Sequence, residues 1–455
     1  MTTSRTNQSL DLQERMATLI RVGDVSELQA MLEELHPSDV ADVLESLNGQ
    51  LRLALMRALP TDLASETLAE MEEGEVRAEL LTALAPAEGA ELLHELSDDD
   101  ATDLVGELPP EARDRLLAEL PSQEAGEIRG LLQYDQESAG GIMTTAFVSV
   151  LGHITAGAAI EAVRVRGREV EDFYTVFVVD EHNTLLGTVP LDDLILADTE
   201  HRVGELVEPT VASVLPEADQ EEVGRMISRY NLASLPVVSD TGVLLGRVTF
   251  DDVIDVIEAE TTEDLLLFSG VSDEEELRGN SFEAVRARLP WLLVNTMTAS
   301  LSAAVVWFFR NEIAAATLLA VAMPMVAGLG GNAGQQALAV TIRRLATSAG
   351  PLEARGRVVR KEILVALLNG GAIGVLVAGA AALLASAMGV DPRLGLVVLL
   401  ATWGNIAMAG FAGSFIPTAL DRIGQDPAVA STVFLTALTD LIGFLLLLGL
   451  ATVLL

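Results

Sequence analysis

The second part of the chain is dominated by long stretches without ionisable side chains. A helix needs about 20 apolar residues to cross the roughly 30 Å hydrocarbon core of a bilayer. Five stretches meet this length, and only Asp440 interrupts the last of them: Leu289 to Phe309, Ile313 to Ile342, Ile363 to Val390, Leu394 to Leu420 and Ala428 to Leu455. Soluble core helices rarely stay uncharged for so long, so the pattern predicts an all-α transmembrane domain of five helices over residues 290–455.

The second of these stretches has an unusual middle, with a proline, several glycines and amide side chains. Irregular backbone at membrane depth is tolerated only where it is buried in protein or lines a wet cavity. Small residues also let helices pack closely, which is the alternative interpretation. We expect the following residues to line or brace a pore: Pro324, Gly330, Gly331, Asn332, Gly334 and Gln335.

Asp440 is the only carboxylate inside any of the five stretches, and none of them contains Lys or Arg to pair with it. A charge at the bilayer centre costs about 2.5–3.5 kcal/mol on insertion scales, so such residues are usually functional. Thr432 and Thr436 precede it by two turns and one turn of helix and share its face, and we expect Gly443 to keep that face open. We predict a cation site at Asp440 and Thr436, with Thr432 lining the path. The alternative is a protonated structural Asp bonded to a neighbour.

The first 137 residues repeat a short pattern and form the most acidic part of the chain. Leu-Pro or closely similar sequences open segments at residues 35, 59, 84 and 108, and about ten apolar-periodic residues follow each. Because Pro is favoured at the start of a helix, the pattern predicts two short helices per repeat, an α-solenoid over residues 1–137. His36 and His94 are expected at its surface and not as metal ligands.

A second repeat, of about 60 residues, fills residues 138–260. The β-rich runs 173–180 and 233–240 match each other, and each is followed by a turn and a second β-rich run. Each unit reads strand, helix, strand, turn, strand, helix. We therefore predict an α/β tandem pair over residues 138–200 and 201–260, followed by a connecting helix and linker over residues 250–289.

Charge divides the chain at the same place. The net charge is −39, with −41 in residues 1–289 and +2 in residues 290–455. A polyanion argues against binding nucleic acid, and the absence of Cys excludes thiolate metal sites. No signal-peptide-like apolar core is seen near the N-terminus, so we expect the acidic part in the cytoplasm. Nine basic residues then flank the membrane helices on the inner side and two on the outer side, which places the C-terminus outside.

The acidic residues cluster where cytoplasmic domains would meet. Divalent cations that bridge them would relieve self-repulsion, so a high internal cation concentration would favour a compact, closed state. The candidate bridging residues lie in the helical domain, in the second repeat unit and on the connecting helix: Asp99, Asp103, Asp219, Glu221, Asp252, Asp255, Glu258, Glu260, Glu263 and Asp264.

The second repeat resembles the CBS domain family. The segments that carry the resemblance are Gly141-Ile142-Met143-Thr144, Leu186-Gly187-Thr188-Val189, Leu232 to Val238 and Leu245 to Asp252. In that family a Thr-x-x-Asp element often holds a nucleotide ribose, and Thr249 and Asp252 match it, whereas Pro190 replaces the Thr in the first copy. The resemblance implies ATP or another adenine nucleotide at the second unit.

The whole chain resembles the MgtE family of magnesium transporters. The order of parts carries the resemblance, together with Met323-Pro324 leading to Gly330-Gly331-Asn332-Ala333-Gly334-Gln335, the acidic helix 255–264, and Asp426-Pro427-Ala428 leading to Asp440. The resemblance implies a homodimer in the cell (inner) membrane, with the pore on the two-fold axis and Asp440 as its carboxylate. It also implies gating by Mg²⁺ bound between the cytoplasmic domains.

Other functions compete with magnesium transport. One is a CBS-gated transporter of Co²⁺, Ni²⁺, Mn²⁺ or another solute, and another is a membrane-bound, divalent-dependent hydrolase. An anion path would need Lys or Arg in the helices, and an enzyme would need several acids or His near the bilayer. Oxygen ligands suit Mg²⁺ and disfavour softer metals only moderately. We therefore predict a magnesium transporter or channel, not an enzyme, whose partners are Mg²⁺, membrane lipid and a second copy of the chain, with no nucleic acid.

Overall fold

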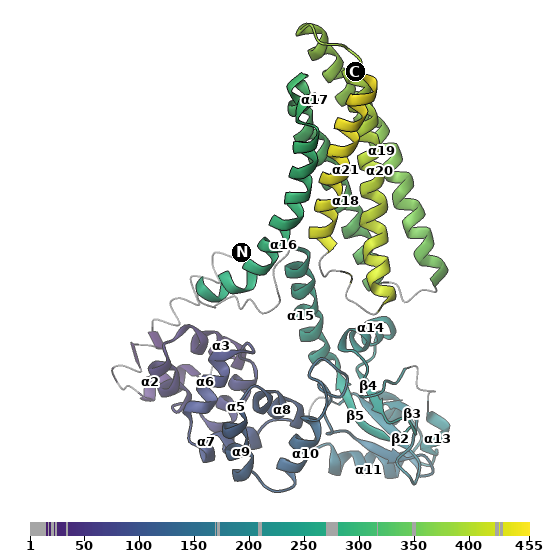
Figure 1. Cartoon of the computed structure of the whole chain (residues 1–455). Coiled ribbons are helices and arrows are strands. Elements are labelled where there is room, and N and C mark those ends of the chain that lie inside the picture. The colour runs from purple at the N-terminus through teal and green to yellow at the C-terminus, as the bar shows by residue number, and fades with distance from the viewer. Residues whose placement is uncertain are drawn as a thin grey trace. The chain divides into compact units, whose positions relative to one another are not determined.

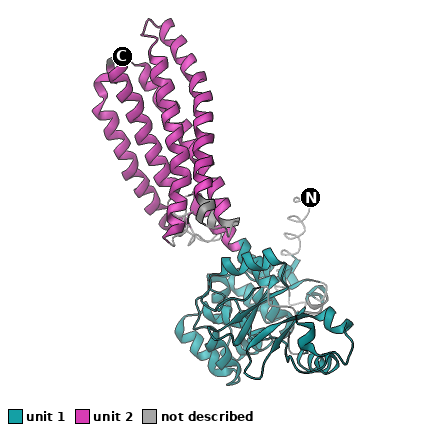
Figure 2. Ribbon diagram, turned by 90° about the vertical axis from the view of Figure 1, so that its right-hand side faces the viewer, with its two compact units in different colours: residues 1–258 teal, residues 259–455 magenta. Residues whose placement is uncertain are grey.

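The computed structural model of the chain describes residues 15–16, 18–19, 22, 25–32, 35–168, 170, 173–207, 212–269, 281–315, 317–347, 352–423, 427 and 431–455. The chain divides into two compact units, Met1–Glu258 and Ala259–Leu455 (Figure 2). Each unit has its own hydrophobic cores. One helix, α15 (Phe250–Ser269), begins in the first unit and ends in the second.

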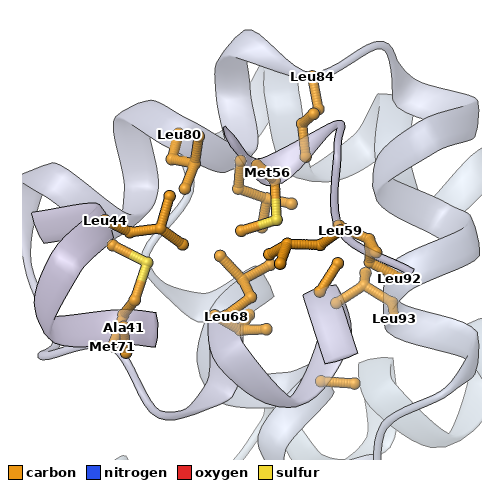
Figure 3. Packing of buried hydrophobic residues seen from close by; sticks show 14 of the residues in the cluster. Ala41, Leu44, Met56, Leu59, Leu68, Met71, Leu80, Leu84, Leu92 and Leu93 are labelled. Carbon is orange, nitrogen blue, oxygen red and sulfur yellow. The ribbon is translucent and has the colours of Figure 1, made fainter. Parts of the chain in front are cut away.

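The first unit starts with short helices joined by tight turns (Figure 1): α2 (Val25–Leu32), α3 (Pro37–Ser46), α4 (Gly49–Met56), α5 (Thr61–Ala69), α6 (Glu75–Ala83), α7 (Pro86–His94), α8 (Asp98–Gly106), α9 (Pro110–Glu119) and α10 (Glu124–Leu131). Proline occupies the first turn of α3, α7 and α9, where its missing N–H removes no helix bond. Alternate helices pack on one another, α3 on α5 and α5 on α7. Side chains such as Leu44, Met56 and Leu68 fill one continuous core between them (Figure 3). The predicted helical N-terminal domain is confirmed.

Three arginines close helical hairpins in this domain. Arg52 of α4 donates to the carbonyl oxygens of Leu44 and Leu47 at the end of α3, at 3.0 and 2.8 Å. Arg77 of α6 donates to the carbonyls of Ala69 and Met71 at the end of α5. Arg113 of α9 donates to those of Gly106 and Leu108 after α8. The last carbonyls of a helix lack intrahelical donors, so each guanidinium satisfies groups that would otherwise be buried unpaired.

The CBS-like pair follows. Its first unit has the predicted order of elements, whereas among the described residues the first strand predicted for the second unit is only an isolated bridge between Val214 and Val237. Its first unit contains β1 (Ser149–Leu151), α11 (Ala156–Arg166), β2 (Thr175–Val179), β3 (Leu185–Pro190) and α12 (Leu191–Leu196); its second contains α13 (Val203–Leu206), α14 (Gln220–Tyr230), β4 (Ser234–Val238) and β5 (Leu244–Thr249). In both units two strands form an antiparallel hairpin with an irregularity near the turn. The two turns meet, since the Leu185 amide donates to the Gly242 carbonyl and the Leu244 amide to that of Asn183, both at 3.0 Å. The two units are therefore paired through equivalent positions.

The second unit is a bundle of long helices: α16 (Ser281–Phe308), α17 (Arg310–Ala315), α18 (Leu318–Thr347), α19 (Leu352–Ala387), α20 (Leu394–Arg422) and α21 (Ser431–Leu454). Helix α20 packs against α18, α19 and α21. Helix α16 begins before the apolar stretch does, so residues 281–289, which we had assigned to the linker, are helical and Pro290 lies inside the helix. Linker residues 270–280 lie outside the described residues.

Four helices in the described ranges are long and apolar enough to cross a membrane: Ala284–Phe308, Gly356–Ala387, Leu394–Arg422 and Thr432–Leu454. The sequence had predicted five spans, and the missing one is α18. Its proline, glycines and amides stand where the other helices carry Leu and Val, so its composition does not mark it as a span. Its 30 residues nevertheless form one continuous helix that packs against α20 and α21.

Candidate metal sites

Helix α21 carries two adjacent rows of side chains around Asp440. The row of Leu435, Thr439 and Gly443 is buried, whereas Thr436 and Asp440 in the neighbouring row are half-buried. Across the described part of the chain, Asp440 forms no hydrogen bond and no ion pair. An ionised carboxylate in an apolar helix needs water or a cation when no protein group pairs with it.

The hydroxyl protons of Thr432 and Thr436 are engaged in hydrogen bonds, and no described residue donates to their oxygens. The Thr436 hydroxyl donates to the Thr432 carbonyl at 2.9 Å, within the helix. The Thr432 hydroxyl donates to the carbonyl of Phe268, near the end of α15, at 2.8 Å. A hydroxyl that donates its proton keeps two acceptor lone pairs, so Thr436 beside Asp440 offers oxygen to a cation or to its water.

The glycine-rich stretch of α18 packs against its neighbours, as the alternative interpretation stated. Gly330 and Gly334 are buried. A Cβ atom added at Gly330 would overlap the Asn405 amide, and one added at Gly334 would lie 2.9 Å from the Leu435 side chain. This packing fits the bracing role that we expected for these two glycines, and the pore-lining role stays a prediction.

The other predicted residues of α18 differ from these glycines. Pro324, Asn332 and Gln335 are exposed on the single chain. Gly331 is half-buried, and an added Cβ would lie 3.9 Å from the Thr439 hydroxyl oxygen, an ordinary contact distance. For these residues, too, the role in lining or bracing the pore stays a prediction.

The surroundings of Gly443 differ from the expectation that it keeps the helix face of Asp440 open. It is buried, and a Cβ atom added there would lie 2.7 Å from Nδ2 of Asn405. The Asn405 side chain therefore fills the space that we expected Gly443 to keep open.

In the first unit, helix α8 is anchored to the CBS-like pair by its first residue. The Asp98 carboxylate accepts hydrogen bonds from the Thr144 hydroxyl at 2.5 Å, the Thr145 amide at 2.9 Å and the Thr145 hydroxyl. Thr144 itself pairs through its backbone with Arg247 of β5. This anchor brings the acidic start of α8 to the start of α15.

The side chains brought together form what we call the acidic interface: Asp99, Asp100 and Asp103 of α8 with Asp251, Asp252 and Asp255 of α15. Asp99 is only 8% exposed, and its Oδ1 has no hydrogen-bond partner among the described residues. Burial raises its pKa well above the ordinary range, and the nearby Asp252 raises it further. The interface thus contains a buried carboxylate oxygen without a donor.

Three further carboxyls of the acidic interface, those of Asp103, Asp252 and Asp255, have pKa values shifted in the same direction. Burial, followed by the charge of Glu73, raises the pKa of Asp103 to about 7. Burial raises that of Asp252 to about 6, although a hydrogen bond from Thr249 opposes the shift. The pKa of Asp255 is raised by burial, then by Glu70. Each of these three carboxyls is disfavoured as an anion, and a nearby cation would favour the ionised form again.

The described residues contain no group of three or more His, Asp or Glu side chains arranged to hold a metal ion directly. Mg²⁺ usually keeps several of its waters and binds through one or two carboxylates. The acidic interface therefore fits a hydrated cation held by pairs of carboxylates from two helices, and it does not fit a dry cage.

Four other predicted regulatory residues lie elsewhere or have structural partners. Asp219 caps α14 by accepting from the Glu221 amide at 2.8 Å, and Glu221 pairs with Arg225 at 3.6 Å. Glu260 and Glu263 lie on the part of α15 that belongs to the second unit. None of these four is among the charges that shift the carboxyls of α8.

The last two predicted regulatory residues complete the set. Glu258 lies close enough to raise the pKa of Asp255. The side chain of Asp264 lies outside the described residues.

Two acids beside the interface were missed. Glu70 follows α5, and Glu73 follows shortly after. The repeat period predicts contacts between alternate helices, but α5 also packs on α8, three helices away. That extra contact brings the two glutamates to the interface, and no pattern in the sequence signals it.

The predicted nucleotide residues share a carboxylate with the acidic interface. The Thr249 hydroxyl donates to Asp252, whose charge also acts on Asp99. In the first unit Pro190 precedes α12, and Asp193 is exposed. Only the second unit combines a hydroxyl with the carboxylate.

Comparison with known proteins decides the family. The chain matches the model of the MgtE intracellular N domain over residues 35–137, the CBS domain model over residues 139–200 and 203–259, and the MgtE divalent cation transporter model over residues 323–450. It is 38% identical to the magnesium transporter MgtE of Enterococcus faecalis, over 98% of both chains. The chain belongs to the MgtE family.

Further MgtE relatives agree. The magnesium transporter MgtE of Thermus thermophilus is 34% identical over 96% of this chain and 97% of its own. Two solved structures are also similar, each with a TM-score of 0.51. One is the soluble part of a magnesium transporter, 32% identical, and the other is the cytosolic domain of the Mg²⁺ channel MgtE in complex with ATP, 36% identical. Each match covers 55% of this chain and 99% of the solved chain. The family is one of membrane ion transporters, and the apolar helices make this chain a multi-pass membrane protein.

Proposed function

We propose that this chain transports Mg²⁺ across the cell membrane and that its soluble domains sense Mg²⁺ on the cytoplasmic side. The observation that carries the proposal is the Asp440 carboxylate on apolar helix α21, which has no partner among the described residues. The relatives that match nearly the whole chain are named magnesium transporters. No membrane enzyme activity is needed to explain this arrangement.

The cation site follows from the chemistry of the two side chains. Mg²⁺ prefers octahedral oxygen ligands and loses its waters reluctantly. One Asp440 carboxylate and one Thr436 oxygen are too few to replace six ligands. A homodimer with its two-fold axis beside α21 would bring two copies of each to one hydrated ion, which is why we propose that state.

Charge supports one orientation in the membrane. With the N-terminus in the cytoplasm, basic residues at the inner ends of the helices outnumber those at the outer ends, Arg310 and Arg393. The positive-inside rule then places both soluble domains in the cytoplasm and the C-terminus outside. This topology needs an odd number of spans, so α18 is the fifth.

Regulation is proposed to act through the acidic interface. Internal Mg²⁺ would replace repulsion between α8 and α15 by shared carboxylate ligation and so hold the two helices together. Helix α15 then continues to Phe268, whose carbonyl is bonded to Thr432 of α21. An adenine nucleotide would bind at Thr249 and Asp252, as an additional regulator.

The experiment is growth of a magnesium-uptake-deficient strain that expresses the full chain. We expect wild type to restore growth and Asp440→Asn to abolish it, because Asn keeps the shape and removes the charge. Asp391→Asn is the matched control: Asp391 lies just before α20, and among the described residues its carboxylate accepts only from the Arg393 amide.

Two outcomes would contradict the proposal. Growth restored by Asp440→Asn would remove that residue from the cation site. Uptake that Co²⁺ or Mn²⁺ saturates at lower concentration than Mg²⁺ would favour a transporter of those metals.

A further inference from the structure

Asn405 of α20 lies at the junction of three helices in the second unit. It is fully buried, and its Nδ2 donates to the carbonyl oxygen of Val326 on α18 at 2.9 Å. The same amide lies against Gly330 of α18 and Gly443 of α21, where an added Cβ would collide with it. One side chain therefore sets the spacing of α18, α20 and α21.

The Asn405 amide is an unusual choice for this place. Its Oδ1 is buried and has no hydrogen-bond partner within the described ranges, and neither has the Thr402 hydroxyl one turn earlier on α20. A buried polar atom left unpaired is unfavourable, and an apolar side chain of similar volume would avoid it. Packing alone therefore does not explain an asparagine here.

The contacts of Asn405 lead to the carboxylate of the transport site. Gly443 lies three residues after Asp440, on the next turn of α21. On the turn before it, Thr439 faces Gly331 of α18. The amide wedged over Gly443 thus fixes both the rotation and the depth of α21 where Asp440 projects.

We propose that Asn405 is a positioning residue for cation transport: it holds α18 through Val326, sits over Gly443, and thereby fixes the direction of the Asp440 carboxylate. The inference rests on the proposed function. Asn405 does not touch the cation. It acts on affinity and selectivity through Asp440.

The test measures Mg²⁺ uptake by the full chain in vesicles, as the half-saturating Mg²⁺ concentration and the maximal rate per inserted protein. Asn405→Ala is expected to raise the half-saturating concentration about 10- to 100-fold, the usual effect of losing a group that orients a metal ligand. It should also weaken discrimination against Ca²⁺. Ser414→Ala is the matched control, because Ser414 is buried on the same helix and its hydroxyl donates only to carbonyls of α20.

Asn405→Asp gives an independent test, which can still be measured if the alanine variant inserts poorly into the membrane. A protonated carboxyl donates to the Val326 carbonyl as the amide does, whereas the ionised form does not. The half-saturating concentration of Asn405→Asp, relative to wild type, should fall as the pH is lowered. Recovery of Mg²⁺ affinity at low pH would show that the hydrogen-bond donor is needed, because protonation would not repair loosened packing.

The outcomes separate the two proposals. Absence of Mg²⁺ uptake by wild type overturns the proposed function itself. Uptake by wild type, with the half-saturating concentration of Asn405→Ala equal to that of Ser414→Ala, overturns the positioning role alone. An Asn405→Asp variant whose half-saturating concentration stays above that of wild type by the same factor at every pH overturns it as well.

Discussion

Gly328 and Gly330 lie on the same helix and differ in what faces them. Nothing lies within 4 Å of a Cβ added at Gly328, whereas one added at Gly330 overlaps the Asn405 amide. We expect Gly330→Ala to destabilise the bundle by about 1–3 kcal/mol through overpacking. Gly328→Ala should be neutral or stabilising by up to about 1 kcal/mol, because Ala favours helix more than Gly.

The measurement for this pair is the thermal unfolding of each purified variant in detergent. A melting temperature for Gly330→Ala equal to that of Gly328→Ala would mean that the helices separate there at no cost. Gly331→Ala, whose new methyl group meets only an ordinary contact, should resemble Gly328→Ala.

Single residues were predictable from the sequence where their chemistry alone was unusual. Asp440 stands out because an acid without a basic partner is rare in an apolar helix, and the structure leaves it unpartnered among the described residues. Asn405 did not stand out. An amide in an uncharged stretch acquires meaning only when the two glycines that it contacts are known, and these lie on other helices.

At the scale of elements, the contact between α15 and α21 makes a specific prediction. Thr432→Val keeps the shape of the side chain and removes the bond to the Phe268 carbonyl. If that bond stabilises the closed pore, its loss costs about 0.5–1.5 kcal/mol, or roughly 2- to 12-fold in the equilibrium. We therefore expect more internal Mg²⁺ to be needed for half-inhibition of transport.

Thr452→Val serves as the control for this prediction, because among the described residues the Thr452 hydroxyl donates only to the Leu448 carbonyl within α21. Inhibition is measured as uptake into vesicles loaded with increasing Mg²⁺. Equal half-inhibiting concentrations for both variants would show that the bond does not discriminate between the open and closed states.

Elements were predictable where one pattern governed them. Short helices followed proline and apolar periodicity, and the strand hairpins followed their turns. Hydropathy did not predict the start of α16. Arg286 and Arg288 lie just before the apolar stretch, but both are compatible with a helix, and the helix begins ahead of them. The length of the uncharged stretch predicted α18 as a span. It did not predict that Gly330 and Gly334 of this helix pack against Asn405 and Leu435 of neighbouring helices.

At the scale of the whole molecule, a net charge of −39 makes stability depend on protons and cations. In the acidic interface the folded pKa values of Asp103 and Asp252, about 7 and about 6, lie above the ordinary value of 3.8. The folded state then binds more protons than the unfolded state between these values. The free energy of unfolding therefore falls as pH rises from about 4 to about 7 in the absence of metal.

Mg²⁺ should reverse this loss where the carboxyls are ionised. We expect Mg²⁺ to raise the melting temperature of the full chain strongly at about pH 7.5 and weakly at about pH 5. Chelation should remove the gain. Asp252→Asn should reduce it, whereas Asp193→Asn, the exposed counterpart in the first CBS unit, should not. A gain that is independent of pH would place the responsible Mg²⁺ outside the acidic interface.

The arginine-closed hairpins determine how the N-terminal domain is made. Arg52, Arg77 and Arg113 each donate to carbonyls only five to eight residues earlier in the chain. Contacts so local in sequence cost little loop-closure entropy, and hairpins held by such contacts form quickly. Each hairpin can close soon after it leaves the ribosome, before the membrane helices have been synthesised. The N-terminal domain is therefore assembled ahead of the membrane helices.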